Sequence, residues 1–221
     1  MASDKQKTIR ILLADDHNIL REGLRTLLEQ LPDMDVVAEV ADGRSAVKQT
    51  RKLVPDVIVI DIGMPDLNGI DATRKIVAEL FNVRVLCLSA HRERSLVRAM
   101  LQAGASGYLL KTSAGEELIE AVRTVAAGGT YLSPPIAEDV VKHFVREKTD
   151  SKGGAYSELT NREREVLQLI AEGHHTKIIA DRLHISPKTV LAHRESVMKK
   201  LGVDSIASLT RYALREGISE L

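Results

Sequence analysis

Polar residues that could do chemistry follow several short apolar runs of this chain. Asp15 and Asp16 follow IRILLA, Asp61 follows VIVI, and Ser89 and Lys111 end two later runs. Three carboxylates that came together would repel one another unless a cation held them, and hard divalent ions prefer oxygen ligands of this kind. A metal ion, a nucleophilic carboxylate and an opposing lysine are the parts that phosphoryl transfer requires.

The elements that would position these residues alternate regularly over the first 130 residues. The β-branched runs IRILLA, MDVVAEV, VIVID, VRVLCLSA and GYLLK are separated by segments of helical periodicity. This alternation predicts a doubly wound α/β domain with a five-strand parallel sheet of flavodoxin-like order 2-1-3-4-5. Functional groups gather beyond the carboxyl ends of such strands, so we expect the five polar residues at one edge. Any one of them alone could instead be a helix cap or a turn residue.

Roles follow from this expected arrangement. Asp61 would be the nucleophile, Lys111 the counter-charge, and the Ser89 hydroxyl a hydrogen-bond donor to the phosphoryl oxygens. Mg2+ is the expected cofactor because it keeps coordination positions open for water and phosphate oxygens.

The composition limits the class of protein. The chain has 221 residues with 31 basic and 31 acidic ones, so any binding of nucleic acid must be local. The single cysteine, Cys87, lies in an apolar run, which predicts a buried and reduced thiol. No apolar run approaches the roughly 20 residues of a membrane-spanning helix. We therefore expect a cytoplasmic protein with no membrane partner.

The pattern changes after residue 130. IAEDVVKHFVREK predicts a short amphipathic helix, and the polar stretch KTDSKGGAYS follows it. We predict a first domain over residues 8–130, a linker with this helix over 131–157, and a second domain over 158–221. The alternative for the linker is a surface loop within one domain.

Residues 158–221 carry the signals of four capped helices. Thr160 and Glu163 predict a capping box, and Thr176 is the expected cap of a short second helix. Ser186 begins a third helix that ends at Gly202, and a fourth amphipathic helix follows. Two short helices joined by a turn inside such a four-helix unit are typical of a helix-turn-helix.

The third of these helices has two distinct faces. Val190, Val197 and Leu201 follow the spacing of a buried stripe. The opposite face, close to the helix start, is predicted to read double-stranded DNA, and a merely solvated face is the alternative. The candidate DNA contacts are Thr176, Lys177, Lys188, Thr189, Leu191, Ala192, Glu195 and Lys199.

The motifs of the first domain resemble the receiver domain of two-component response regulators. ADD, DIGMPDLNG, LSA and GYLLK occur in the order typical of that family. The resemblance implies that Asp61 accepts a phosphoryl group from a sensor histidine kinase. It also implies that Asp16, Asp61 and the carbonyl of Gly63 ligate Mg2+, while Asp15 acts through a water molecule.

The same resemblance assigns further positions. Ser89 and Tyr108 occupy the switch positions of the family, where a hydroxyl group and an aromatic ring move together after phosphorylation. Gly69 helps to shape the loop that follows the acceptor. Gly63 and His91 lie at less constrained positions, and we predict that they tune the lifetime of the phosphoryl group.

The second domain is similar throughout to the LuxR-type DNA-binding domain, and a receiver ahead of it matches the NarL/FixJ class of transcription regulators. Many members have a basic residue where this chain has Leu191, so we expect a different or looser base preference. The resemblance implies a homodimer when phosphorylated, with contacts from Ser205, Leu209 and Tyr212 in the last helix. We expect the unphosphorylated receiver to mask that helix.

The charge of the second domain supports pairing. Residues 158–221 contain ten basic and nine acidic side chains, a net charge of +1. The general electrostatic attraction of one such domain to DNA is therefore weak, and two linked domains would gain effective concentration.

Two other functions remain open. An aspartyl-phosphate hydrolase would also place a nucleophilic aspartate after a strand, but it usually has a second aspartate two residues later, where this chain has Gly63. The other is a DNA-binding regulator whose receiver acts as a phosphorylation-independent dimerisation or ligand module. We expect a phosphoryl acceptor with at most slow self-dephosphorylation rather than an enzyme.

Overall fold

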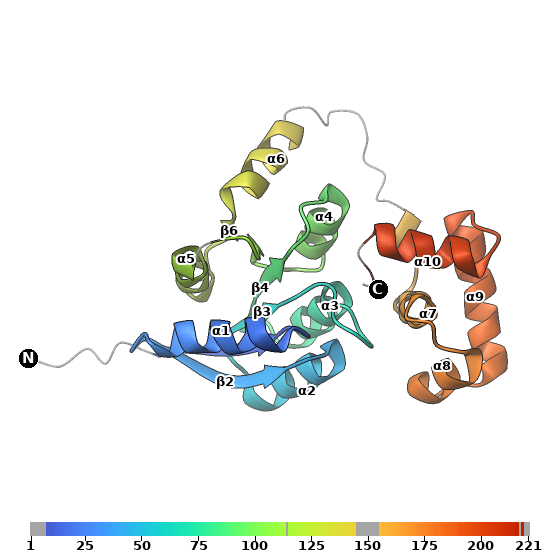
Figure 1. Cartoon of the computed structure of the whole chain (residues 1–221), viewed down its shortest axis with the longest axis horizontal. Coiled ribbons are helices and arrows are strands. Elements are labelled where there is room, and N and C mark those ends of the chain that lie inside the picture. Colours follow the sequence, from blue (N-terminus) through green and yellow to red (C-terminus); the bar gives the residue numbers. More distant parts are fainter. Residues whose placement is uncertain (1–7, 114, 145–154, 217, 219–221) are drawn as a thin grey trace, which may run out of the picture.

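A parallel sheet forms the centre of the N-terminal domain (Figure 1). The computed structural model describes residues 8–113, 115–144, 155–216 and 218. The strands run in the order β2-β1-β3-β4-β5-β6, and every neighbouring pair is parallel. The predicted order 2-1-3-4-5 is confirmed, with one short strand added at the edge. The strands are β1 (Ile9–Ala14), β2 (Met34–Val40), β3 (Val57–Ile60), β4 (Arg84–Ser89), β5 (Gly107–Leu110) and β6 (Tyr131–Leu132).

Helices cover both faces of this sheet. Successive side chains of β1 point to opposite faces, so Leu12 packs with one apolar cluster and Leu13 with another. The first cluster includes side chains of α2, α3 and α4, and the second includes those of α1 and α5. The helices are α1 (Asn18–Glu29), α2 (Gly43–Leu53), α3 (Gly69–Glu79), α4 (Arg94–Gln102) and α5 (Gly115–Ala126).

The sixth strand extends the N-terminal domain beyond the predicted boundary. Tyr131 pairs with Gly107 in β5, and Ile136 in α6 (Pro134–Phe144) is buried in the core of this domain. A two-residue strand shows no periodicity, so the sequence pattern alone missed it. The predicted linker over 131–157 therefore begins too early. Its middle, residues 145–154, lies outside the described residues.

The C-terminal domain is helical and has a core of its own. Its elements are a 3-10 helix, η1 (Ala155–Glu158), and the helices α7 (Asn161–Ala171), α8 (Thr176–Leu183), α9 (Pro187–Leu201) and α10 (Ile206–Arg215). None of the helices in the described part of the chain combines the length and the apolar composition that crossing a membrane requires.

The predicted caps of these helices are largely confirmed. Thr160 accepts a hydrogen bond from the backbone N–H of Glu163, whose carboxylate accepts one from the backbone N–H of Thr160, 2.7 Å away. Ser186 caps α9, and Gly202 ends it with a left-handed φ of 65°. The cap prediction for Thr176 is wrong, because Thr176 is the first helical residue and His175 precedes it without a side-chain cap.

Glu163 does more than cap α7. Its carboxylate also accepts hydrogen bonds from Ser196 and Lys200 on α9, both at 2.6 Å. Burial favours the protonated form, but the bonds from Lys200, Ser196 and Thr160 outweigh it and lower the pKa of Glu163 to about 2. One carboxylate therefore joins the start of α7 to the helix predicted to read DNA.

Replacing Glu163 with Gln tests this junction. The lowered pKa means that Glu163 stabilises the fold fully above its ordinary pKa of 4.5, and this contribution is lost as pH falls towards 2. Glu163→Gln should lower the free energy of unfolding at pH 7 by roughly 2 kcal/mol, and the deficit should shrink as pH falls. Urea denaturation at several pH values measures this. The exposed control Glu195→Gln should show no such trend, and a pH-independent deficit would contradict the assignment.

Candidate functional site

Acidic side chains meet at the carboxyl edge of the sheet, as predicted. Asp15 and Asp16 directly follow β1, and Asp61 directly follows the neighbouring strand β3. Ligand atoms of these three residues and of His17 all lie within 4.8 Å of one another. His17 was not among the residues predicted for this site, although its position directly after the two aspartates was a signal for it.

Lys111 supplies the positive charge at this edge. Its Nζ atom lies 2.6 Å from Asp61 Oδ2 and 2.9 Å from Asp15 Oδ2. Burial raises the pKa of Asp61, Lys111 opposes this rise, and the charge of Asp15 adds to it. Burial also acts to lower the pKa of Lys111, but the two carboxylates outweigh it and raise that pKa. Lys111 is therefore a cation, and it offsets only part of the negative charge.

The remaining negative charge fits a hard cation. Asp15 Oδ2 and Asp16 Oδ1 are buried oxygens that accept no hydrogen bond, although Lys111 and the His17 ring lie within 3 Å of them. Carboxylate oxygens left in this state are suitable ligands for a divalent ion such as Mg2+. Asp16 is the most accessible of the three acids, with a side chain 33% exposed. The cluster of Asp15, Asp16 and Asp61 is therefore consistent with a metal site.

Backbone groups of β1 and of the loop after β3 hold Asp61 in place. The Asp61 N–H donates to the carbonyl of Ala14 at 2.8 Å, and the Ile62 N–H donates to Asp61 Oδ1 at 2.7 Å. Gly69, which begins α3, comes so close that a Cβ atom there would lie 1.9 Å from the Asp61 carbonyl oxygen. Glycine is therefore required at this position, in agreement with the predicted role in shaping the loop.

The two predicted switch residues lie on neighbouring strands. Ser89 and Tyr108 are both fully buried. The Tyr108 hydroxyl donates to the His91 carbonyl at 2.9 Å, and the His91 N–H donates to Ser89 Oγ at 3.1 Å. Burial raises the pKa of Tyr108, so its hydroxyl remains a donor. His91 thus connects the two switch residues through its backbone, whereas its side chain lies 3.4 Å from Glu93.

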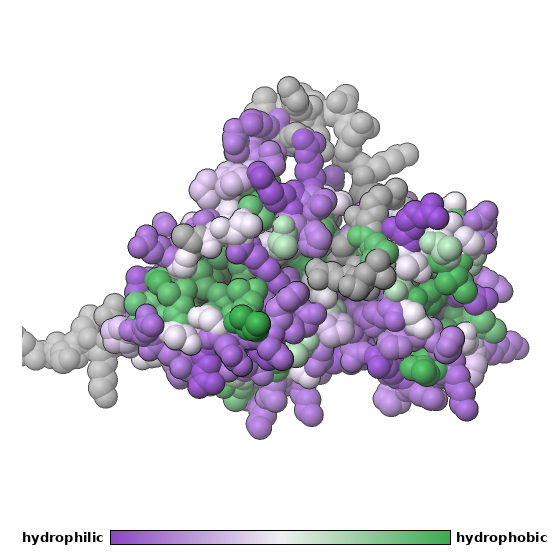
Figure 2. All heavy atoms as spheres, in the orientation of Figure 1, coloured by the Kyte–Doolittle hydropathy of each residue, from purple (hydrophilic) through white to green (hydrophobic). Residues whose placement is uncertain are grey.

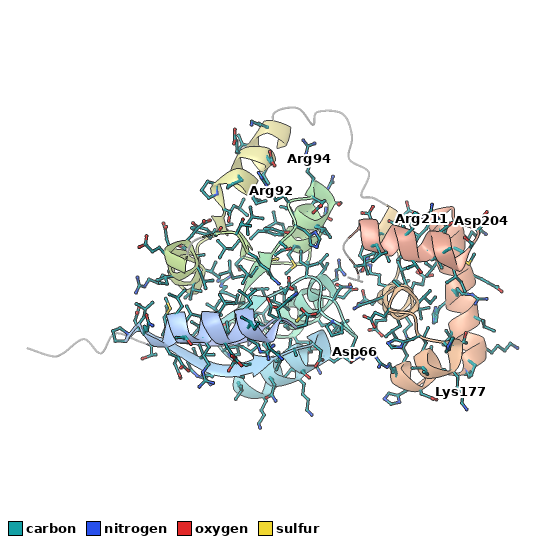
Figure 3. The ribbon with its side chains drawn as sticks, in the orientation of Figure 1. Asp66, Arg92, Arg94, Lys177, Asp204 and Arg211 are labelled. Atoms are coloured by element: carbon teal, nitrogen blue, oxygen red, sulfur yellow. The ribbon has the colours of Figure 1, made fainter. Side chains whose placement is uncertain are left out.

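The predicted faces of α9 agree with the structure. Val190 and Val197 are buried in the core of the C-terminal domain. Thr189 and Thr176 are half-buried, and Lys177 lies exposed on α8 (Figure 3). The remaining candidates for DNA contacts are all exposed, namely Lys188, Leu191, Ala192, Glu195 and Lys199.

The prediction for the last helix needs a correction. Leu209 is fully buried in the core that α10 forms with α7, so its side chain is not available to a second copy. Tyr212 packs partly against the same core. Ser205 caps α10 by accepting a hydrogen bond from the Ser208 N–H. Ile206 is a large apolar side chain on α10 that is 51% exposed.

Comparison with known proteins gives the family. Residues 11–123 match the model of the response regulator receiver domain, and residues 157–213 match that of bacterial regulatory proteins of the luxR family. The chain is 37% identical to the transcriptional regulatory protein DegU of Brevibacillus brevis, with 96% of this chain and 95% of DegU covered. It is 36% identical to the response regulator UvrY of Escherichia coli K12, with 95% of each covered.

The chain belongs to the two-component response regulators that carry a LuxR-type DNA-binding domain. A solved structure of RcsB from Salmonella enterica serovar Typhimurium, bound to promoter P1flhDC with the phosphomimetic BeF3-, is 28% identical to it. That match has a TM-score of 0.63 and covers 93% of this chain and 98% of RcsB. Proteins of this family act as phosphoryl acceptors rather than as enzymes with a turned-over substrate.

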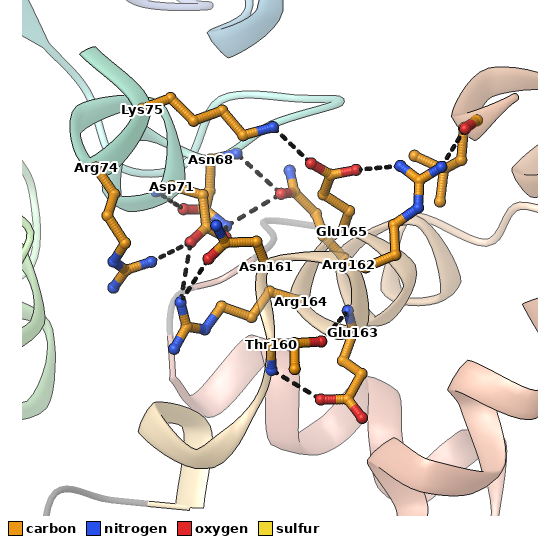
Figure 4. Close-up of polar contacts among 12 residues, drawn as sticks. Asn68, Asp71, Arg74, Lys75, Thr160, Asn161, Arg162, Glu163, Arg164 and Glu165 are labelled. Atoms are coloured by element: carbon orange, nitrogen blue, oxygen red, sulfur yellow. Dashed lines mark hydrogen bonds and ion pairs between the residues drawn. The ribbon is translucent and has the colours of Figure 1, made fainter. Parts of the chain in front are cut away.

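The two domains of this response regulator are in contact (Figure 4), which could not be predicted from the sequence. Asp66, in the loop after Asp61, points towards the C-terminal domain (Figure 3). Its carboxylate pairs with Arg182 of α8, and its N–H donates to Glu172 at 3.2 Å. Asp66, Glu172 and His174 form a second group of possible metal ligands among the described residues. Arg182 and Gln168 already pair with the two carboxylates there.

Replacing Lys111 tests the charge balance at the carboxyl edge of the sheet. Lys111→Met leaves two buried carboxylates without their partner, so the free energy of unfolding should fall by roughly 2–4 kcal/mol in metal-free buffer at pH 7. Adding Asp61→Asn in that background should restore part of the loss, because it removes one of the repelling charges. A double-mutant cycle by urea denaturation measures this coupling, and strictly additive effects would contradict it.

Proposed function

We propose that phosphorylation of Asp61 by a sensor histidine kinase controls the pairing of this regulator on promoter DNA. The observation that carries the proposal is the position of Asp61, which lies within the matched receiver domain and contacts Lys111 beside Asp15. The partner of the reaction is a phosphohistidine, whose P–N bond breaks as the bond between phosphorus and an Asp61 oxygen forms.

The neighbouring residues support this transfer in distinct ways. When bound, Mg2+ would neutralise charge on the transferred group. Asp16, Asp61 and the Gly63 carbonyl are its proposed ligands, with Asp15 acting through water. Lys111 moves from the Asp61 carboxylate to the new phosphoryl oxygens and so keeps a counter-charge throughout. Ser89 turns its hydroxyl towards the same oxygens, which frees Tyr108 and the backbone of His91 to rearrange.

A groove beside the site is suited to the kinase. It has a volume of about 640 Å³ and lies between α1 and the start of α5, and Figure 2 shows apolar side chains gathered on that face. Ile19 on α1 is 89% exposed, and Leu20 beside it is half-buried. An exposed apolar surface next to the acceptor supports docking of a helix that carries the phosphohistidine. The groove also includes His17, Leu20, Leu24, Leu27 and Lys111.

Double-stranded DNA is the proposed partner of the exposed face of α9. Lys188 at its start can reach a guanine edge or a phosphate, and Leu191 can contact a thymine methyl group. Glu195 can accept a hydrogen bond from a cytosine amino group. Thr176, Lys177, Thr189, Ala192 and Lys199 complete the proposed contact surface. The similarity of this chain to RcsB, whose structure contains promoter DNA, supports this role.

A homodimer is the proposed DNA-bound form. A related structure contains two RcsB dimers bound to two parallel DNAs. On this chain, Ile206 and Arg211 are exposed on α10 and replace the buried Leu209 as the proposed contacts, with Ser205 and Tyr212 at the margin. Gly63 and His91 remain the proposed determinants of phosphoryl lifetime. A histidine kinase and promoter DNA as partners support a cytoplasmic location.

The phosphorylation proposal is tested with acetyl phosphate, Mg2+ and the full chain. Intact mass should show one phosphate-sized adduct on the wild type and none on Asp61→Asn, and EDTA should prevent it. The affinity for a DNA duplex selected from a random pool should rise only for protein that carries the phosphate-sized adduct. Continuous release of phosphate would favour a hydrolase. DNA binding that is independent of the adduct would favour the alternative, a receiver that acts only as a dimerisation module.

The DNA proposal predicts a local effect of charge on α9. Lys188→Ala should weaken binding of the phosphorylated chain to that duplex by about tenfold, because a base or phosphate contact is worth about 1–3 kcal/mol. Lys52→Ala removes the same charge from an exposed position on α2 and serves as the matched control. Fluorescence anisotropy at fixed salt measures both. Equal effects of the two changes would contradict the assigned surface.

A further inference from the structure

The imidazole of His17 brings a second nitrogen atom to the acidic cluster, besides that of Lys111. The closest contacts of Lys111 Nζ are to the Oδ2 atoms of Asp15 and Asp61. His17 Nδ1 instead lies 3.1 Å from Asp15 Oδ1 and 2.9 Å from Asp16 Oδ1. Lysine is a cation and cannot bind a metal ion in that form, whereas an imidazole nitrogen is a common metal ligand. His17 therefore adds a nitrogen ligand to a site whose other side-chain ligands are oxygens.

One imidazole nitrogen cannot satisfy both of the oxygens that it approaches. Nδ1 carries at most one hydrogen, and its geometry allows a hydrogen bond with Asp15 Oδ1. Asp16 Oδ1 is the nearer oxygen, yet it is buried and accepts no hydrogen bond. Neighbouring ligand atoms of an octahedral divalent ion lie about 3 Å apart, because each bond to the ion is about 2.1 Å long. A cation would thus satisfy the imidazole and both oxygens at once.

The position of His17 in the fold does not explain why its ring lies beside the acids. His17 is the N-cap residue of α1, but its side chain makes no capping hydrogen bond. Ser, Thr, Asp and Asn are the residues that stabilise a helix start in this way, and histidine is not among them. Because the side chain is 54% exposed, close packing is not what places the ring there. The contact with the acids is the remaining role of this imidazole.

A nitrogen ligand changes which ion a site of this kind prefers. Mg2+ takes oxygen ligands and keeps several of its water molecules. Imidazole instead favours first-row transition ions, and its contribution to affinity rises from Mn2+ through Co2+ to Ni2+. The three aspartates alone would give a site for a hard ion. With His17 beside them, the same site gains affinity for transition ions but not for Mg2+.

We propose that His17 is a ligand of the ion at the acidic cluster, and that it gives this site a preference for transition ions such as Co2+ or Zn2+ over Mg2+. The inference rests on the proposed function and deepens it, since it assigns the ion with which Asp61 accepts a phosphoryl group. A transition ion occupies the site at a lower concentration than Mg2+ does, and the selectivity resides in one side chain.

Nitrogen NMR with Zn2+ tests the ligand directly. In the full chain with isotope-labelled imidazole rings, one equivalent of Zn2+ should shift the resonance of His17 Nδ1 and leave those of His91 and His174 in place. His17→Asn identifies the resonance by removing it, and it keeps the start of α1 because Asn is a preferred N-cap residue. A shift at His174 alone would place the ion at the group of Asp66, Glu172 and His174 and would overturn the proposal.

Metal affinities separate a ligand from a residue that only orients the acids. Isothermal titration calorimetry should show that His17→Asn lowers the affinity for Co2+ by about tenfold and that for Mg2+ by less than about twofold. A histidine that only positions Asp15 and Asp16 would lower both affinities by the same factor, and that result would contradict the assignment. His91→Asn removes another histidine of this domain and should retain the preference for Co2+.

Phosphorylation connects the ion to the proposed function. With acetyl phosphate and the wild type, Co2+ should support the phosphate-sized adduct at a concentration about tenfold lower than Mg2+, and His17→Asn should abolish this difference. Equal requirements for the two ions in the wild type would overturn the inference and leave the proposed function intact. No adduct with either ion, beside a His17 nitrogen that Zn2+ shifts, would overturn the proposed function and leave the ligand assignment intact.

Discussion

The balance of charge at the carboxyl edge of the sheet is the constraint on which the rest of the receiver depends. Asp15 and Asp61 are almost completely buried, and Lys111 alone contacts both of them among the described cations. One lysine cannot neutralise three carboxylates, so the site stores repulsion that a divalent ion and a phosphoryl group would redistribute. Burial of apolar side chains in the clusters on both faces of the sheet offsets the free-energy cost of burying these carboxylates.

The loop that follows Asp61 connects the acidic site to the C-terminal domain. The loop from Asp61 to Gly69 is held at one end by the Ala14 carbonyl and at the other by the close approach of Gly69. Between these fixed points, the Met64 carbonyl and the Asn68 N–H turn towards the C-terminal domain and bind Gln168. Only a few peptide groups of one loop therefore separate Asp61 from the interface between the domains.

Electrostatics also organises the DNA-binding domain. Glu163 ties the start of α7 to Ser196 and Lys200 on the back of α9, and its low pKa records the strength of that junction. The domain has a net charge of only +1 over residues 158–221, so a single copy gains little from the general field of DNA. Control of pairing is an effective switch for such a domain, because affinity rises steeply when two copies act together.

The sequence by itself determined the strand order, the acceptor edge and the two faces of α9, because apolar periodicity and cap residues act over short distances along the chain. It missed the two-residue strand at Tyr131, which exists only through pairing with β5, and it placed Leu209 on a surface although α7 buries it. Nothing in the local pattern marked Gln168, because a glutamine within an amphipathic helix has no signature. The contact of Gln168 with Met64 and Asn68, about 100 residues earlier in the chain, was decided by tertiary structure alone, since only the folded domains bring those peptide groups together.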